Sequence, residues 1–283
     1  MSSLMSYIKL ARLDKPIGIY LLLWPSLLGL MLGAVNEGYV DFENYLIVLA
    51  GAILVRSCGC VINDISDYKF DKLVKRTKDR PIASGEIGLK EAWIFFIILA
   101  IASLNLLFLT PPITIKLALF FSLLILLYPL AKRFIRAPQI VLGITFGSGS
   151  IISYSLQSDS FSISLVFLYI GLIAWIVSFD TIYALEDIDD DIKIGINSTP
   201  ILWGKKTIFI SNILHCIFYS AIGLIAYINN FSNYFIVIIC LLFVLFYHQN
   251  NLVKEGRYLE SFKFNNNVGI LLIIGFAIEI FLI

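Results

Sequence analysis

The chain of 283 residues contains little charge: Asp, Glu, Lys and Arg make up only 14% of it, against about a quarter of an ordinary soluble domain. It has only two histidines and four cysteines, and none of them stands in an HExxH or CxxC spacing. These absences argue against a zinc site and against a disulfide framework. We therefore expect Cys58, Cys60, Cys216 and Cys240 to be small apolar side chains, and His215 and His248 to be core or interface residues.

Hydrophobic residues make up 59% of the chain and gather in nine long runs. A helix needs roughly 20 apolar residues to cross a bilayer core about 30 Å thick. Because the runs show no period-two alternation, they predict helices and not a barrel. We predict an all-α polytopic membrane protein with one membrane domain over residues 1–283, in which the last span is short. The predicted spans are 17–35, 44–62, 92–110, 113–131, 139–157, 163–184, 207–228, 233–250 and 268–283.

Basic residues lie almost entirely in alternate connections between these spans. The N-terminal segment carries Lys9, Arg12 and Lys15, and the connection between the second and third spans carries seven more basic residues. This asymmetry predicts a cytoplasmic N-terminus and, with nine spans, a C-terminus on the other side. We expect the first 16 residues to form an amphipathic segment at the interface and not a cleavable signal. The pattern fits a bacterial inner (plasma) membrane.

Polar residues recur along one face at the end of the second span. If that helix continues past the membrane surface, Arg56, Asn63, Asp67 and Asp71 stand at i, i+7, i+11 and i+15. Asp64 lies off this face and ranks lower as a candidate. An arginine about two turns deep in a span is costly, so Arg56 is expected to face a partner or a cavity.

The sixth span ends in a matching pattern, DTIYALEDIDDDIKIG. In a continuous helix, Asp180, Tyr183, Asp187 and Asp191 stand at i, i+3, i+7 and i+11 and share one stripe. Two helix ends on the cytoplasmic side thus each carry a pair of carboxylates four residues apart. A single such pair is weak evidence, because charges at membrane edges are common, but two matching boxes favour a functional site.

Four carboxylates close together repel one another and raise each other's pKa unless a cation lies between them. Oxygen ligands without histidine or cysteine favour hard cations, and Mg²⁺ typically combines a few carboxylates with phosphate oxygens. The basic residues after the first box, Lys75, Arg76, Lys78 and Arg80, would then balance phosphate charge. The pattern predicts a site in which carboxylates, metal, phosphate and guanidinium groups alternate.

At these residues the chain resembles the intramembrane aromatic prenyltransferases of the UbiA superfamily. The resemblance covers nearly the whole chain, through LDKPIGIYLLLWPSLLGL, RSCGCVINDISDYKFDKLVKRTKDRPIASG, YPLAKRFIRAPQIVLGITFG, DTIYALEDIDDDIKIGINSTPILWG and NNNVGILLIIGF. The DKPIG, YPLAKR and DDDIKIGINST segments are similar to the 4-hydroxybenzoate polyprenyltransferase branch of ubiquinone biosynthesis. The resemblance implies a nine-helix bundle with the boxes over a central cavity, a lateral opening to lipid, and Mg²⁺ dependence. The implied substrates are a polyprenyl diphosphate and 4-hydroxybenzoate.

The resemblance also implies roles for individual residues. The metal ligands would be Asn63, Asp67, Asp71, Asp187 and Asp191, of which the four aspartates are the catalytic candidates. Lys132 and Arg133 match the family's basic pair after the fourth span. From the residues themselves we expect the substrate to be bound also by Arg56, Asn63, Lys75, Arg76, Arg80, Tyr183 and Lys193, with Arg56 as the candidate for the aromatic carboxylate. Asn197 departs from the family pattern, which has a lysine there, so a phosphate contact at that position is in doubt.

Two other functions remain open at this point. A related prenyltransferase that uses dihydroxynaphthoate or haem as acceptor would share the acidic boxes, and an acceptor panel would separate the two. A secondary transporter or cation channel also places acids in a membrane protein, but its acids are expected near the midplane and not at one face. We expect the lipid bilayer as surroundings, no nucleic acid and no obligatory protein partner.

Overall fold

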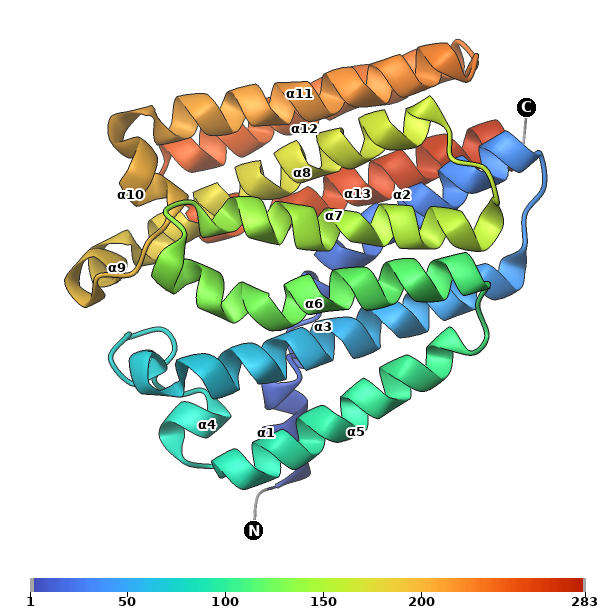
Figure 1. Cartoon of the computed structure of the whole chain (residues 1–283). Helices are drawn as coiled ribbons and strands as arrows, with labels where there is room; N and C mark the ends of the chain where they lie inside the picture. The colour runs from blue at the N-terminus through green and yellow to red at the C-terminus, as the bar shows by residue number, and fades with distance from the viewer. Residues whose placement is uncertain (1–2, 282–283) are drawn as a thin grey trace.

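The computed structural model describes residues 3–281, apart from the side chains of residues 128–133 and 194 (Figure 1). Over these residues every regular element is a helix, which confirms the predicted fold class. The helices are α1 (Leu4–Leu10), α2 (Ile17–Glu37), α3 (Phe42–Asp71), α4 (Pro81–Ser84), α5 (Leu89–Leu107), α6 (Pro112–Phe134), α7 (Pro138–Gln157), α8 (Ile163–Ala184), η1 (Leu185–Asp187), α9 (Ile188–Ile194), α10 (Thr199–Trp203), η2 (Gly204–Lys206), α11 (Thr207–Ile228), α12 (Tyr234–Lys254) and α13 (Tyr258–Phe281).

Each predicted span coincides with one long helix. Within the described residues, eight segments are long and apolar enough to cross a membrane, and α6 adds a shorter apolar stretch, Pro112–Leu127. The expectation of a short last span is wrong, because α13 runs for 24 residues from Tyr258 to Phe281. The first turns of α13 contain polar residues such as Asn265. A count of apolar residues alone therefore places the start of this helix too late.

Local chemistry sets several of the helix ends. The side chain of Asp41 accepts a hydrogen bond from the backbone N–H of Glu43 at the start of α3, and Ser162 caps α8 in the same way. Gly38 ends α2 with φ of 71°, a conformation that glycine adopts without steric cost. These caps place the turns between helices at the ends of the apolar runs.

Buried apolar side chains form two main cores, and a third, small cluster joins α2 and α3. The larger core joins α2, α7, α8, α11, α12 and α13, where the rings of Trp175 and Phe218 stack at 4.8 Å. The backbones of α2 and α7 approach so closely that a Cβ on Gly29 would lie 2.0 Å from the carbonyl oxygen of Ser150. A smaller core joins α1, α3, α4 and α5.

The two acidic boxes lie at the same end of the bundle. In Figure 1 the C-terminal end of α3 and the segment from the end of α8 into α9 both lie at the left. The predicted continuous stripe on the sixth span is wrong, because α8 stops at Ala184 and a 3₁₀ turn, η1, separates it from α9. Asp187 closes that turn with a non-helical φ of −110°. The second box is therefore a bent segment and not a straight helix end.

Candidate active site

A cavity of about 1260 Å³ lies between the two groups of helices. One end is polar and includes Asn63, Asp67, Asp71, Asp187 and Asp191 among its lining residues. The other arm is apolar and runs along α3, α5, α6 and α7, past residues such as Gly51, Leu107, Phe121 and Leu156. The volume exceeds the roughly 300–1,000 Å³ of most small-molecule sites. The cavity therefore combines an ionic head region with room for a long apolar group.

Asp64 and Asp71 are held by two arginines at the polar end. The Nη1 of Arg80 donates to both carboxylate oxygens of Asp71, at 2.9 and 3.0 Å, and to Oδ1 of Asp64 at 3.1 Å. The Nη2 of Arg12 donates to both oxygens of Asp64, at 2.8 and 2.9 Å. Partial burial alone would lower the pKa of Arg80, but the charges of Asp64 and Asp71 outweigh it and raise that pKa. Arg80 therefore stays charged.

Arg76 connects the two acidic boxes. Its guanidinium donates through Nε to both oxygens of Asp187, at 2.9 and 3.0 Å, and through Nη1 to the hydroxyl of Tyr183 at 2.7 Å. The ring of Phe262 stacks on Tyr183 and fixes its position. Burial acts to lower the pKa of Arg76, but its hydrogen bonds with Asp187 raise that pKa above its ordinary value. A residue that follows α3 thus binds the end of the second box directly.

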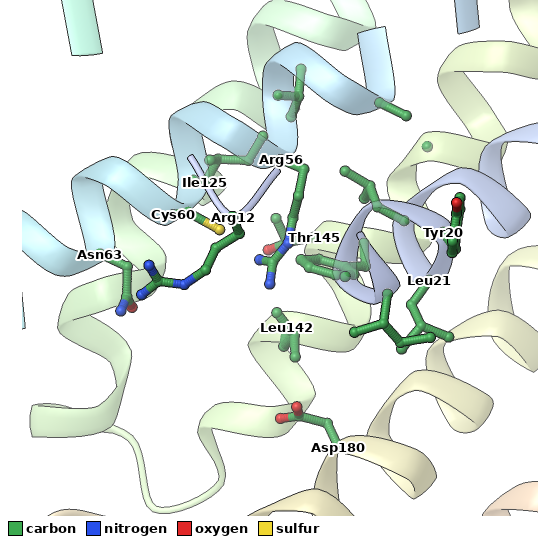
Figure 2. A pocket seen from close by; sticks show the side chains of 18 of the residues that line it. Arg12, Tyr20, Leu21, Arg56, Cys60, Asn63, Ile125, Leu142, Thr145 and Asp180 are labelled. Atoms are coloured by element: carbon green, nitrogen blue, oxygen red, sulfur yellow. The ribbon is translucent and has the colours of Figure 1, made fainter. Parts of the chain in front are cut away.

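Arg56 points into the cavity from the middle of α3. Figure 2 shows its guanidinium entering the open space, with Arg12 extended toward Asn63 and with Asp180 on the opposite wall. The guanidinium carbon lies 5.5 Å from the centre of the Phe146 ring, and the buried Nε has no hydrogen-bond partner. A buried donor without a partner is costly and rare. The guanidinium group, which enters the open space, is therefore a candidate to bind an anionic ligand.

The structure does not bring every predicted residue to the cavity. Lys75 does not line it, and neither does Lys193, whose side chain is 73% exposed and lies 3.5 Å from Asp190. The side chains of Lys132 and Arg133 fall outside the described part of the structure. Asn197 lines the cavity although it departs from the family pattern.

Asp67, Asp71, Asp187 and Asp191 all line the cavity, but they do not form a compact ion site among the described residues. No group of three or more acidic, histidine or cysteine side chains there is close enough to hold an ion. Asp71 and Asp187 are instead bonded to Arg80 and Arg76. The donor set nevertheless fits a hard cation, because the polar end offers carboxylate and amide oxygens and no histidine lines the cavity.

Sequence reasoning missed Arg12 and ranked Asp64 too low. Arg12 was counted only among the basic residues that set orientation, and Asp64 stands off the face shared by Asn63, Asp67 and Asp71. In the structure both line the cavity, and the Asp64 side chain is 2% exposed. One feature of the sequence could have indicated Asp64: it directly follows Asn63 in the first acidic box, and basic residues lie on both sides of that box.

The fold and the site together define a polytopic helical membrane protein whose cavity suits a ligand with an anionic head and an apolar tail. The family model of the "UbiA prenyltransferase family" matches residues 22–268 of the chain. The chain belongs to this family, and it is a prenyltransferase.

Individual proteins agree with this assignment. A curated relative from Vesicomyosocius okutanii subsp. Calyptogena okutanii, named 4-hydroxybenzoate octaprenyltransferase, is 40% identical over 95% of this chain and 99% of its own. The apo structure of a UbiA homolog from Aeropyrum pernix K1 has a TM-score of 0.80 at 24% identity, covering 91% of this chain and 96% of its own. A UbiA homolog from Archaeoglobus fulgidus, solved bound to GPP and Mg²⁺, has a TM-score of 0.73 at 17% identity, covering 97% and 99%.

Proposed function

We propose that this protein transfers a polyprenyl group from a polyprenyl diphosphate to the ring carbon ortho to the hydroxyl of 4-hydroxybenzoate, a step of ubiquinone biosynthesis. The observation that carries the proposal is that one cavity combines an acid- and arginine-lined head with an apolar arm. The acceptor follows from the name of the relative that is 40% identical over almost the whole chain.

The diphosphate head belongs at the polar end of the cavity. Asn63, Asp67, Asp71, Asp187 and Asp191 would hold Mg²⁺ there, as the homolog bound to GPP and Mg²⁺ suggests, and the ion would supply charge neutralisation of the leaving diphosphate. Arg76 and Arg80 lie among these acids and are placed to bind phosphate oxygens when Asp187 and Asp71 exchange partners.

The aromatic acceptor belongs beside Arg56. Its buried Nε has no partner, and the guanidinium group is already packed over the Phe146 ring. A carboxylate can accept two parallel hydrogen bonds from a guanidinium, which fixes the orientation of the acid as well as its position. The benzoate ring would then lie in the cavity between Arg56 and the polar end.

The reaction needs a good leaving group and a site without bulk water. The bond between the allylic carbon and the diphosphate oxygen weakens as arginines share the developing negative charge, and the carbon becomes cation-like. The electron-rich carbon ortho to the hydroxyl attacks it and then loses its proton. The apolar lining of the arm keeps water from reacting with the cation.

The distribution of basic residues supports a location for the enzyme. We place it in a bacterial inner membrane, with the N-terminus and the active site on the cytoplasmic side. Both acidic boxes lie at the end of the bundle where the basic connections also lie.

Mass spectrometry of reaction products tests the proposal. Purified protein is incubated with Mg²⁺, prenyl diphosphates of several lengths and a panel of acceptors that includes 4-hydroxybenzoate, dihydroxynaphthoate and haem. The expected product is 4-hydroxybenzoate carrying one prenyl group on a ring carbon. Prenylation of dihydroxynaphthoate or haem in its place would contradict the proposed acceptor.

A further inference from the structure

Asp64 is the most buried acid of the first box, and it contacts two arginines from different parts of the chain. Arg12 comes from the connection between α1 and α2, and Arg80 comes from the segment before α4. Arg12 also has φ of 59°, a left-handed conformation that is unfavourable for a residue with a side chain. Such a conformation persists only where surrounding contacts hold it. Two contacts supply that restraint: Nη2 of Arg12 donates to both oxygens of Asp64, and Nη1 donates to the carbonyl oxygen of Lys9 at 2.8 Å.

Both arginines line the cavity, so the contacts with Asp64 help to fix the positions of two guanidinium groups there. Arg80 is shared between Asp64 and Asp71. When Asp71 turns to a ligand, Asp64 still holds Arg80 at the polar end. Without Asp64, Arg80 would have Asp71 as its single acidic partner in this contact and would compete for that carboxylate.

From this geometry we propose that Asp64 is a positioning residue that holds Arg12 and Arg80 at the diphosphate end of the cavity, which makes the N-terminal segment part of the substrate site. The kinetic test of this inference rests on the proposed function, because it measures prenyl transfer to 4-hydroxybenzoate. In this proposal Asp64 acts through the two guanidinium groups that it contacts. Figure 2 shows Arg12 reaching across to the side of the cavity that carries Asn63.

The first test compares the kinetics of Asp64→Asn and Asp64→Glu with Asp159→Asn as control, an exposed aspartate outside the cavity. Loss of the charge-assisted contacts should raise the KM for prenyl diphosphate about ten- to a hundredfold in Asp64→Asn. The KM for 4-hydroxybenzoate should change less than about twofold, because Arg56 is untouched. Asp64→Glu should recover most of the loss. Equal rises of both KM values, or no rise in a folded variant, would overturn the proposal.

The second test uses no enzyme activity. Trypsin must take the side chain of Arg12 into its own acidic pocket to cut the Arg12–Leu13 bond, so pairing with Asp64 protects that bond. Intact-mass analysis should show several times faster cleavage there in Asp64→Asn than in wild type or Asp159→Asn. Unchanged cleavage in Asp64→Asn would overturn the proposal that Asp64 holds Arg12. Absence of hydroxybenzoate transfer by the wild-type protein is a different result and would count against the proposed function alone.

If Asp64→Asn does not fold, Arg12→Gln tests the same contact while Asp64 keeps Arg80. This variant should raise the KM for prenyl diphosphate about three- to tenfold and leave the KM for 4-hydroxybenzoate unchanged. An unchanged KM for prenyl diphosphate in Arg12→Gln would remove the N-terminal segment from the site.

Discussion

The carboxylates Asp67 and Asp187 belong to different boxes but line the same cavity. We expect Asp67→Ala and Asp187→Ala each to lower product formation about a hundredfold or more, since each removes a proposed ligand of the Mg²⁺ that would neutralise the diphosphate. Both variants should elute and melt as wild type does in detergent, with Asp159→Ala as control. Near-normal turnover in the two variants, measured with radiolabelled 4-hydroxybenzoate, would refute the metal assignment.

Arg56 tests the acceptor site separately. Arg56→Ala should raise the KM for 4-hydroxybenzoate about ten- to a hundredfold, the usual effect of losing a hydrogen bond to a charged group. The KM for prenyl diphosphate should change little, because the diphosphate is proposed to bind at the polar end of the cavity and not at Arg56. Arg136→Ala, which removes an exposed arginine outside the cavity lining, is the control. An unchanged KM for the aromatic acid would exclude Arg56 from this role.

Gly18 leaves the space that the Arg56 guanidinium fills. A Cβ on Gly18 would lie 2.7 Å from Nη2 and 2.8 Å from Nε of Arg56, so the guanidinium must shift in Gly18→Ala. We expect the KM for 4-hydroxybenzoate to rise about fivefold, equivalent to about 1 kcal/mol of binding free energy. Steady-state kinetics should show no such rise in Gly223→Ala, whose Cβ would meet its nearest neighbour at 3.9 Å. An unchanged KM for 4-hydroxybenzoate in Gly18→Ala would show that acceptor binding does not depend on the position of the Arg56 guanidinium.

Single residues also mark what sequence can and cannot predict. The types and spacing of Asn63, Asp67 and Asp71 pointed to a ligand face because helix periodicity places them together. The partners of these acids could not be predicted, since Arg76 bonds to Asp187 across 111 positions of sequence and only the fold brings them together. Lys75, which stands beside Arg76, fails to reach the cavity for the same reason.

At the scale of the element, α9 depends on the glycine that follows it. Gly195 has φ of 76°, and its N–H donates to the carbonyl of Asp191 at 3.0 Å, which ends the helix beside that carboxylate. Gly195→Ala should destabilise the protein by about 1 kcal/mol, because a side chain disfavours this conformation. Thermal unfolding should shift down by a few degrees. Gly59→Ala, in α3 with no atom within 4 Å of its new Cβ, should not lower the melting temperature. An equal shift in both variants would contradict the capping role.

The elements differ in how well their ends could be predicted. Apolar runs such as 163–184 predicted α8 to the residue, because a chain in lipid must satisfy its backbone within one helix. Beyond the apolar core that constraint disappears. The sequence therefore could not predict that η1 separates α8 from α9, or that α13 begins at Tyr258.

At the scale of the whole molecule, we expect the fold not to depend on the metal. The larger core joins α2, α7, α8, α11, α12 and α13 through apolar side chains. We expect EDTA to stop product formation and Mg²⁺ to restore it, while the melting temperature changes by less than a few degrees. A calcium-supplemented sample serves as control for the choice of ion. Full turnover in EDTA would contradict a metal-dependent reaction.

Arg76 and Arg80 pair with acids of the two boxes, and this has a consequence for binding of the diphosphate. Arg76 is the counter-ion of Asp187, and Arg80 is the counter-ion of Asp71. As a diphosphate arrives, they can swing from carboxylate to phosphate oxygen, so one set of salt links is exchanged for another. Asp71 and Asp187 would then be released to bind Mg²⁺, whose charge would offset part of the negative charge that the diphosphate brings to the edge of the membrane.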